Sequence, residues 1–431
     1  MARSSNVTRI SDDSLCVRDI PGENGKAYTK GGKEFVLREI ISSGGEGAVY
    51  RTTFSDMLVA KIYKEGKITR RKERKIELML EKNLRHEGIC FPVEILYNGR
   101  GEFVGYLMPR ARGDTLKNSL FGKPQFMDHF PQWKKYDVVE LALTILQKIE
   151  YLHGQGILMG DIKGENILVE DSKNVYFVDT DSYQIGEFPC PVISEEFTPP
   201  ELIGRRCGSR LRTVGNENFA VATLLFKIVM QGINPYSHVG GGSPLENIRK
   251  MNFSFPFGTS NFQTPGGSTG PYFCCWDHLS MKIREAFFNT FSRNGNMNTE
   301  DTRPDVRKWI KIFSMYDHHL REHLSPGDES NKVYPESLRV KEGEGIFCKA
   351  GQHLVREKGF SKVGRSIGVC KECLGAPFRD GPYFCSRCGG EISYTGYDHY
   401  IKHIPVPPAG SCECSACNPG SEYELVSKQF I

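Results

Sequence analysis

The sequence predicts an α+β protein in which a small antiparallel sheet comes first, a largely helical region follows, and a small cysteine-rich domain lies toward the C-terminal end. Short apolar segments recur between residues 34 and 108, a pattern that favours strands with short connections. Residues 136–153 carry apolar side chains at steps of three and four, the spacing of a helix that is buried on one face. Eight of the 14 cysteines lie between Cys348 and Cys417, which indicates a separate small unit.

The bulk composition is that of an ordinary soluble protein. The chain has 431 residues, enough for about two or three domains. Hydrophobic residues make up 39% and charged residues 25%, and the net charge of +4 is too small to indicate nucleic acid or a membrane surface. The longest apolar run, residues 219–230, contains Lys227 and is shorter than the ~20 residues of a membrane span. The first residues lack the apolar core of a secretion signal, so we expect a cytoplasmic protein.

A polar N-terminal segment leads into a glycine-rich turn. Residues 1–33 show no apolar period, so we expect a flexible arm, whereas residues 34–41 favour a strand. The stretch S-S-G-G-E-G-A-V-Y over residues 42–50 then places glycines between two strands. Backbone N–H groups at such a turn can approach phosphate oxygens closely, because no side chain intervenes. Alone the turn is weak evidence, since a loose hairpin has the same composition.

Further segments complete the predicted sheet and its first helix. The strand M-L-V-A-K-I-Y carries Lys61 in an apolar setting, and residues 69–84 are charged and helical in pattern. Residues 91–98 and 102–108 favour two more strands, so that the sheet would have five antiparallel strands.

Four polar residues in the stretch 156–181 are the candidates for chemistry. Asp161 is followed by Lys163 and by Asn166, which opens an apolar strand, and a second apolar strand ends at Asp179. Phosphoryl transfer from a magnesium nucleotide needs such a set: one carboxylate deprotonates the attacking hydroxyl, while another carboxylate and an amide oxygen hold Mg²⁺. The alternative is a pair of hairpin strands with turn residues, because Asp and Asn favour turns.

Together these motifs resemble those of the protein kinases over about residues 34–323. The segments V-A-K, D-I-K-G-E-N and F-V-D-T-D stand in the order and spacing of that family's lysine, catalytic-loop and metal-binding motifs. The details F-V-D-T-D-S-Y-Q-I and P-P-E resemble a bacterial branch of eukaryotic-like Ser/Thr kinases. That branch includes kinases linked to helix-hairpin-helix modules and kinases of tellurium-resistance-type operons. The resemblance implies a two-lobed kinase fold, with an N-lobe over residues 34–109 and a C-lobe over residues 110–323.

The resemblance also implies a Mg-ATP-dependent Ser/Thr protein kinase. Asp161 would accept the proton of the substrate hydroxyl, and Lys163 would steady the transferred phosphate. Lys61 would grip the α- and β-phosphates and would be held by Glu77, which lies nine residues before the histidine of L-R-H-E-G-I. The residues that would contact the nucleotide are Ser42, Gly44, Gly47, Val49, Lys61, Met108, Asn166 and Asp179, the last two through Mg²⁺.

Two acidic residues further along match structural positions of the family. Glu201 closes F-T-P-P-E, which resembles the end of an activation segment, and such a glutamate normally pairs with a buried arginine downstream. Arg303, in T-R-P-D-V-R-K-W-I, is the candidate partner. Glu217 stands where the family usually has an aspartate, at the start of the central buried helix.

The sequence departs from the kinase pattern at two points. Met159 and Gly160 replace the His-Arg before Asp161, so the arginine that would bind an activation-loop phosphate is absent. We therefore expect activity that does not depend on that phosphate. Thr180 and Asp181 replace the Phe and Gly of the usual D-F-G, which removes the switch that depends on Phe packing.

Two alternatives belong to other functional classes. A nucleotide-binding pseudokinase scaffold would recruit partners through the cysteine-rich domain, and a small-molecule phosphotransferase of related fold would act on another substrate. Lys61, Asp161, Asn166 and Asp179 are all retained, which favours activity. Lys163 and the P-P-E segment favour a protein substrate.

The C-terminal cysteines predict zinc binding. C-x-x-C pairs in a reducing compartment indicate metal more often than disulfides, and tetrahedral zinc takes four Cys or His ligands. The segment has few large apolar residues, so metal would replace part of a core. The preferred scheme has two sites, Cys348, His353, Cys370 and Cys373 in one and Cys385, Cys388, Cys414 and Cys417 in the other, with Cys412 spare. The alternative is one ribbon of Cys370, Cys373, Cys385 and Cys388, with Cys412, Cys414, Cys417 and either His399 or His403 nearby.

The predicted organisation is an arm, a kinase domain, a linker and a zinc-binding module, over residues 1–33, 34–323, 324–345 and 346–431 respectively. We expect the module to dock a protein or to regulate the kinase. Its basic stretch favours a solvated face over a nucleic-acid contact. The operon resemblance implies a partner phosphatase and a von Willebrand A-type protein, by analogy with that family alone.

Overall fold

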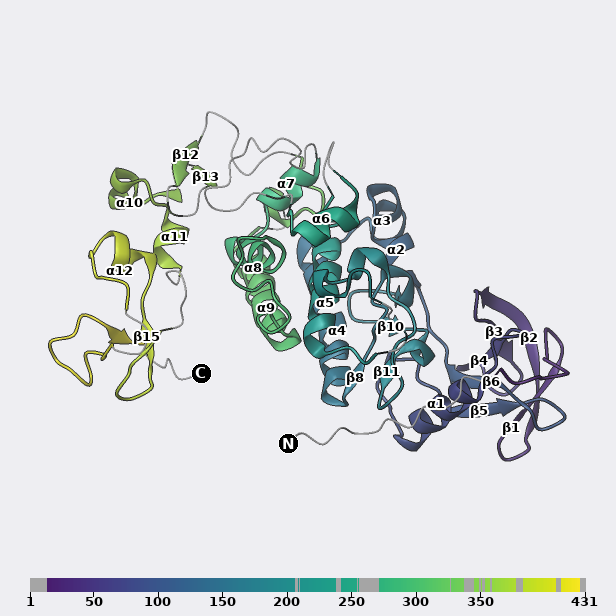
Figure 1. Cartoon of the computed structure of the whole chain (residues 1–431). Coiled ribbons are helices and arrows are strands. Elements are labelled where there is room, and N and C mark those ends of the chain that lie inside the picture. The colour runs from purple at the N-terminus through teal and green to yellow at the C-terminus, as the bar shows by residue number, and fades with distance from the viewer. Residues whose placement is uncertain are drawn as a thin grey trace. The chain divides into compact units, whose positions relative to one another are not determined.

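The computed structural model describes residues 14–205, 208, 210–237, 242–253, 255, 271–325, 327–336, 345–348, 350, 353–356, 359–376, 383–407 and 412–426. These residues fall into two compact units (Figure 1). The first lies within Met1–Ser254 and Glu285–Tyr334, and the second within Phe255–Arg284 and Pro335–Ile431. None of the helices in the described ranges has both the length and the apolar character that a membrane span requires.

The first unit begins with a closed antiparallel barrel. Its strands follow the order β1-β2-β3-β4-β6-β5, and the pairing of β1 with β5 closes the ring. Most of these strands are neighbours in sequence, so short turns join them. The bounds are β1 (Lys26–Thr29), β2 (Glu34–Ser43), β3 (Gly47–Thr52), β4 (Leu58–Tyr63), β5 (Glu94–Tyr97) and β6 (Phe103–Pro109).

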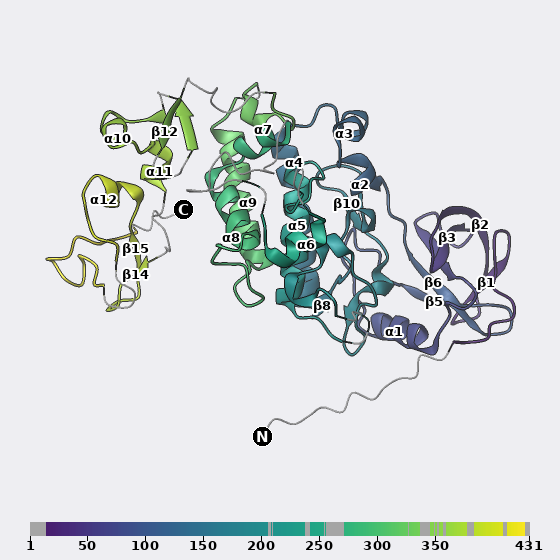
Figure 2. The same ribbon diagram turned by 45° about the horizontal axis from the view of Figure 1, so that its top comes forward.

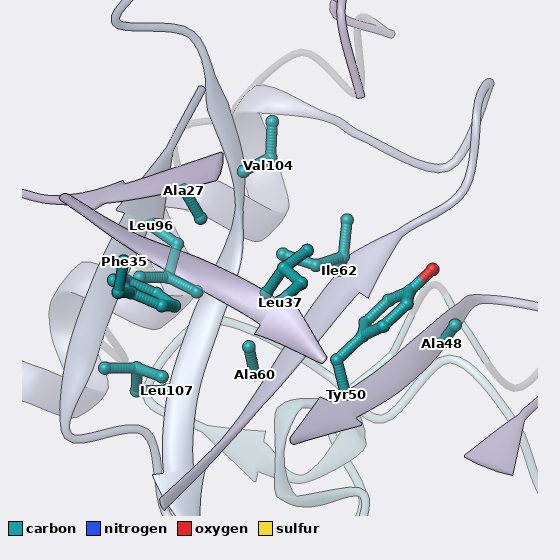
Figure 3. Packing of buried hydrophobic residues seen from close by; sticks show 10 residues of the cluster. All are labelled: Ala27, Phe35, Leu37, Ala48, Tyr50, Ala60, Ile62, Leu96, Val104 and Leu107. Carbon is teal, nitrogen blue, oxygen red and sulfur yellow. The ribbon is translucent and has the colours of Figure 1, made fainter. Parts of the chain in front are cut away.

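Alternating apolar side chains fill this barrel. Phe35 and Leu37 lie two residues apart on β2 and therefore point to the same face, where they meet Leu96 of β5 and Leu107 of β6 (Figure 3). Leu37, Leu96 and Leu107 are completely buried. The period of two that predicted these strands thus also determines which side chains form the barrel core.

The structure differs from the sequence prediction in the first strand. Lys26–Thr29 lies inside the predicted flexible arm, yet it forms β1 and gives the sheet a sixth strand. Ala27 and Thr29 are buried while Lys26 and Tyr28 point outward, which is the alternation of a half-buried strand. Four residues are too few for that period to stand out in sequence. Residues 1–13 of the predicted arm lie outside the described residues.

Helix α1 (Arg70–Glu81) lies between β4 and β5 in sequence. The hydroxyl of Thr69 accepts a hydrogen bond from the N–H of Lys72 and caps the helix N-terminus. The inward face consists of Lys75, Ile76 and Met79. A charged residue at the centre of this buried face is unusual and bears directly on the candidate site.

Helices form most of the remainder of the first unit. Helix α4 packs along α9 and also contacts α5, and these helices run side by side in Figure 2. Phe226 of α5, Phe291 at the end of α8 and Trp309 of α9 are completely buried in this core. The bounds are α2 (Leu116–Ser119), α3 (Lys123–His129), α4 (Lys135–Gly154), α5 (Val214–Val229), α6 (Pro244–Lys250), α8 (Met281–Phe291), which belongs to this unit from Glu285 on, and α9 (Val306–Glu322).

Five short strands hold the predicted catalytic stretch. β8 pairs with β11, while β9 pairs with both β10 and β7. The loop that carries Asp161 therefore lies between β8 and β9, and Asp179 follows β10. The bounds are β7 (Asp114–Thr115), β8 (Ile157–Leu158), β9 (Ile167–Val169), β10 (Val175–Phe177) and β11 (Gln184–Ile185).

The second unit contains short elements around two cysteine clusters. Strand β12 pairs with β13, and β15 pairs with both β14 and β16. The bounds are α7 (Pro271–Asp277), β12 (Gly345–Cys348), β13 (His353–Arg356), α10 (Lys362–Ile367), α11 (Lys371–Gly375), β14 (Tyr383–Phe384), β15 (Glu391–Ser393), α12 (Gly396–Tyr400) and β16 (Glu424–Leu425).

Candidate active site and cysteine clusters

Asp161 lies at the centre of a network of side chains. Its carboxylate is 3% exposed, and the Lys163 ammonium lies 2.5 Å from Oδ2. The Ser194 hydroxyl donates to Oδ1 at 2.9 Å, and the Asn166 side-chain amide donates to the Asp161 carbonyl at 3.0 Å. The structure thus brings together three residues that the sequence placed in one motif and adds Ser194, which the sequence analysis did not select.

Glu217 holds the backbone of the Asp161 loop through hydrogen bonds. Its carboxylate accepts hydrogen bonds from the N–H groups of Met159 at 3.1 Å and Gly160 at 2.7 Å. The His153 ring nitrogen lies 3.0 Å from the same carboxylate. Because Glu217 is buried in the first turn of α5, the central helix and the loop are rigidly connected.

Lys61 contacts two aspartates. Its ammonium lies 2.6 Å from Asp179 Oδ1 and 2.5 Å from Asp181 Oδ1. Burial would lower the pKa of Lys61, but the carboxylates of Asp181 and Asp179 outweigh it and raise the pKa above its ordinary value. Lys61 is therefore a charged lysine that the segment after β10 holds in place.

The sequence analysis expected Glu77 to pair with Lys61, but the structure does not bring the two residues together. Glu77 instead lies 3.1 Å from Arg74 on the same helix, and its side chain is one-third exposed. Successive residues of a helix are rotated by about 100°, so Glu77 points roughly 200° away from the buried Lys75. In this structure the contacts of Lys61 come from the segment after β10, and Glu77 contacts Arg74.

Asp181 is the carboxylate that the sequence analysis missed as a partner of Lys61. Besides Lys61 it accepts hydrogen bonds from the hydroxyls of Tyr63 at 2.7 Å and Tyr106 at 2.8 Å. Burial raises the pKa of Asp181, but Lys61 and the tyrosine hydroxyls hold the pKa below the usual range. The Lys75 ammonium donates to the main-chain carbonyl of Asp181 at 2.6 Å. A lysine on the inward face of α1 together with an acid after Asp179 was the sequence signal for this arrangement.

Asp179 and Asp181 differ in their access to solvent. The Asp179 side chain is 39% exposed, whereas that of Asp181 is 9% exposed. Asp179 has a left-handed backbone conformation with φ near 58°, which aspartate tolerates better than most residues. Thr180 is buried and donates to the carbonyl of Cys90 at 2.8 Å. A hydrogen bond thus anchors the position where the kinase pattern has a phenylalanine.

The glycine-rich turn joins β2 to β3. The Gly44 N–H donates to the Gly47 carbonyl at 2.9 Å, and Ser42 pairs with Val49 across the hairpin. A Cβ at Gly47 would lie 2.4 Å from the Ile62 carbonyl, whereas a Cβ at Gly44 meets nothing within 4 Å. The absence of a side chain at Gly47 therefore permits close approach to β4, a packing role that the sequence analysis did not foresee.

The remaining predicted nucleotide residues lie on the barrel strands. Val49 is opposite Lys61 in the β3–β4 pairing, and Met108 is opposite Val59 in the β4–β6 pairing. Met108 is buried, at 5% exposure, near the end of β6.

Arg212 connects the chain around Val192 to the Asp161 loop. Its guanidinium donates to the carbonyls of Gly160 and Val192, and its side chain is buried. The Arg212 N–H donates to the side-chain oxygen of Gln184 at 2.7 Å, and the Gln184 side-chain nitrogen donates to the Arg212 carbonyl at 2.8 Å. The sequence analysis did not identify Arg212, because it lies outside every motif and finds its partners through main-chain carbonyls.

The predicted pair of Glu201 and Arg303 is confirmed. The two guanidinium nitrogens donate to the two carboxylate oxygens at 2.6 and 2.7 Å. The Arg303 side chain is 1% exposed and that of Glu201 is 25% exposed. Burial raises the pKa of Glu201, but Arg303 outweighs that effect and lowers the pKa below its usual value.

Replacing Arg303 with methionine should lower the free energy of unfolding by roughly 3 kcal/mol, because Glu201 would lose its buried partner. The wild-type pair stabilises the fold fully above the ordinary Glu pKa of about 4.3, and this contribution is lost as the pH falls through the lowered pKa. Urea unfolding at pH 7 and at pH 3 measures both effects. Arg307→Met is the matched control, because Arg307 pairs with Glu150 at an exposed site and should contribute less than about 1 kcal/mol. An equal effect of both substitutions would contradict the prediction.

The cysteines of the second unit form two clusters. The sulfurs of Cys385, Cys388, Cys414 and Cys417 all lie within 4.8 Å of one another, and so do those of Cys348, Cys370 and Cys373. This grouping corresponds to the two-site scheme and differs from the single ribbon, in which Cys370 and Cys373 would share a site with Cys385 and Cys388. The register of β12 and β13 places His353 opposite Cys348, while the His353 side chain lies outside the described residues.

The geometry of the four-cysteine cluster fits zinc. The sulfurs of Cys388 and Cys414 lie 3.8 Å apart, and a tetrahedron with zinc–sulfur bonds of about 2.3 Å has sulfurs about 3.8 Å apart. The Cys414 N–H points at the Cys385 sulfur at 3.3 Å. Backbone N–H groups of Cys388 and Cys414 lower the pKa of the Cys385 thiol to about 6, which favours the thiolate that zinc requires.

The three-cysteine cluster has similar surroundings. The Cys370 N–H donates to the Cys348 sulfur at 3.3 Å, and the Cys373 N–H donates to the Cys370 sulfur at 3.4 Å. Val369 and Leu374 are buried beside these thiols. Such N–H contacts orient thiolate ligands around a metal.

Comparison with known proteins identifies a protein kinase domain in the chain. Residues 35–267 match the protein kinase domain family, and the chain belongs to this family. The matched region contains nearly all of β2, the strands β3 to β6, α1 and the loops of Asp161 and Asp179, whereas β1 lies before it.

Bacterial protein kinases are among the similar curated proteins. The chain is 25% identical over 327 residues to protein kinase YegI of Escherichia coli strain K12, covering 73% of this chain and 49% of that protein. It is 28% identical over 149 residues to the probable serine/threonine-protein kinase YbdM of Bacillus subtilis strain 168, covering 32% of this chain and 54% of that protein. The chain thus spans about half the length of these curated relatives.

Proposed function

We propose that this protein is a Mg-ATP-dependent kinase that phosphorylates serine or threonine in a protein substrate. The observation that carries the proposal is the Asp161 network, in which a buried carboxylate is bonded to Lys163 and lies beside Asn166. The hydroxyl of Ser194 already donates to Asp161 at 2.9 Å, the distance at which a carboxylate can accept the proton of a substrate hydroxyl. Lys163 is placed to neutralise charge next to that carboxylate.

The residues that would hold Mg²⁺ offer suitable donors. The Asp179 carboxylate is partly exposed, and the Asn166 amide nitrogen is committed to the Asp161 carbonyl, which leaves the amide oxygen for a cation. Bound Mg²⁺ would bridge phosphate oxygens and neutralise their charge. Lys61 would then grip the α- and β-phosphates, and the barrel residues Ser42, Gly44, Gly47, Val49 and Met108 would line the nucleotide.

The cysteine clusters support the proposal of a zinc-binding module that docks a protein or regulates the kinase. A partner phosphatase and a von Willebrand A-type protein are proposed partners that rest only on resemblance to helix-hairpin-helix and tellurium-type kinases. We also propose a cytoplasmic location and a two-lobed kinase domain.

One observation supports the alternative function, a nucleotide-binding scaffold without kinase activity. The Lys61 ammonium forms an ion pair with Asp179, so the carboxylate that is proposed to bind Mg²⁺ already contacts a lysine in this structure. The kinase would transfer phosphate from ATP to a protein, whereas the scaffold would bind nucleotide without transferring phosphate.

Phosphate transfer from radiolabelled Mg-ATP tests the proposal. Wild type and Asp161→Ala are offered a generic Ser/Thr-containing protein and the kinase itself, and the labelled residue is identified after acid hydrolysis. The proposal predicts labelled serine or threonine with wild type and no label with the variant. Zinc-replete, nucleotide-binding wild type that transfers no label would favour the scaffold instead.

We also expect activity without a phosphate on the activation segment, because Arg212 already ties Gly160 to Val192. Phosphatase treatment should change the turnover rate less than twofold. Arg212→Met should lower it at least tenfold, since each lost hydrogen bond to a charged group is worth roughly 1.5–3 kcal/mol. Arg210→Met, at an exposed position two residues earlier, is the control. Loss of turnover on dephosphorylation, with recovery when a segment phosphate is restored, would contradict this prediction.

A further inference from the structure

We propose that Asp181 is the positioning residue that holds Lys61 for the nucleotide phosphates, in place of a carboxylate from helix α1. The inference rests on the proposed function, because it assigns a partner to the phosphate-gripping lysine of that site. It starts from the two contacts of the Lys61 ammonium, 2.5 Å to Asp181 and 2.6 Å to Asp179.

Exposure separates the roles of these two acids. Asp179 is 39% exposed and remains open to a ligand, whereas Asp181 is 9% exposed and is enclosed by its partners. When a cation occupies Asp179, the carboxylate of Asp181 still holds the lysine. Asp181 is thus the permanent partner of Lys61, and Asp179 is the exchangeable one.

The carboxylate of Asp181 is bonded to the barrel itself. Tyr63 and Lys61 lie on β4, and Tyr106 lies opposite Lys61 on β6. Both tyrosine hydroxyls donate to Asp181, so three donors from two adjacent strands fix one carboxylate. The two rings are completely buried or nearly so, at 1% and 0% exposure, which keeps water from competing for the carboxylate.

The helix supplies a cation where a carboxylate was expected. The buried face of α1 presents Lys75, which is bonded to the Asp181 carbonyl at 2.6 Å. In the expected arrangement, α1 would supply the carboxylate of Glu77 to Lys61. In the structure, α1 supplies the ammonium of Lys75, and the carboxylate comes from Asp181. Two lysines, one from the barrel and one from the helix, hold opposite ends of Asp181. A shift of α1 would break the Lys75 contact and leave the contact between Lys61 and Asp181 intact.

Binding of ADP and of adenosine by calorimetry separates positioning of Lys61 from general damage to the site. Adenosine lacks the phosphates that Lys61 would contact, so it serves as the internal control. Asp181→Asn should weaken ADP binding at least tenfold and leave adenosine binding within twofold. Asp181→Glu should recover part of the ADP affinity. In a Lys61→Met background, Asp181→Asn should add no further loss, because the two residues act as one unit.

Glu77→Gln tests the rival partner, and Glu81→Gln, at an exposed position on the same helix, is the matched control. Loss of ADP affinity in Glu77→Gln with retention in Asp181→Asn would overturn the inference. Parallel loss of ADP and adenosine binding in Asp181→Asn would also overturn it, because it would show a merely structural role. If Asp181→Asn does not fold, Tyr106→Phe removes one donor and should give the same selective loss of ADP affinity in smaller measure; unchanged ADP binding would then overturn the inference. Wild type that binds adenosine and ADP equally would instead contradict the proposed function.

Discussion

Asp179→Asn is expected to lower the rate of phosphate transfer roughly a thousandfold, a loss of about 4 kcal/mol in transition-state stabilisation. The substitution removes the charge of the partly exposed carboxylate proposed for Mg²⁺. The fold should survive, because Lys61 keeps Asp181 as its partner. Lys61 would therefore remain paired, and the variant should lose function without unfolding.

A magnesium titration of phosphate transfer measures this effect. The variant should need more Mg²⁺ and should not reach the wild-type rate at saturation. Glu187→Gln is a suitable control, because Glu187 is an exposed acid of the same segment. Retention of activity within tenfold of wild type would show that Asp179 does not hold the catalytic metal.

Removing zinc is expected to unfold the cysteine-rich module. Its buried core beside the four-cysteine cluster contains only a few large apolar residues, among them Ile392, Tyr394 and Ile404. Structural zinc contributes about 10–16 kcal/mol in small zinc-binding peptides, far more than a core of this size supplies. Without the metal, the four closely spaced thiols would make no bonds that replace the zinc–sulfur bonds, so the folded module should lose its stability.

Single substitutions should locate the metal. Cys414→Ser is expected to lower the bound zinc by one ion per chain, because Cys414 belongs to the four-cysteine cluster. Cys412→Ser is the matched control, since Cys412 is buried in the same segment but belongs to neither cluster in the described part of the chain. Metal content measured by mass spectrometry distinguishes the two variants. Equal zinc in both would exclude the four-cysteine site.

Local patterns in the sequence were sufficient for much of the fold. The strands β2 to β6 and helix α4 have periods that a single segment displays, and the pair of Glu201 and Arg303 follows from two motifs of known partnership. Four-residue β1 was missed because a period of two needs more residues to be evident. Its pairing with β5 depends on a segment almost 70 residues away.

The differences between the expected and the observed contacts at the candidate site have a common physical cause. Glu77 was chosen by spacing along the chain, whereas the structure pairs Lys61 with Asp179 and Asp181, which follow β10. Arg212 acts through main-chain carbonyls, which cannot be recognised in a residue type. The Asp181 carboxylate is held by residues of β4 and β6, which lie far from it in sequence. The side chains of local motifs were predictable, and so was the pair of Glu201 and Arg303, whereas the tertiary partners of Lys61 and Gly160 were not.

The closed barrel gives β1 a protective role. In an open sheet, the outer strands present rows of unsatisfied N–H and C=O groups that can pair with another molecule. Here β1 covers both β2 and β5, so the ring leaves no free border. A chain that lacked Lys26–Thr29 would expose one edge of β2 and one edge of β5 at once. The short N-terminal strand therefore protects the protein against intermolecular strand addition and aggregation.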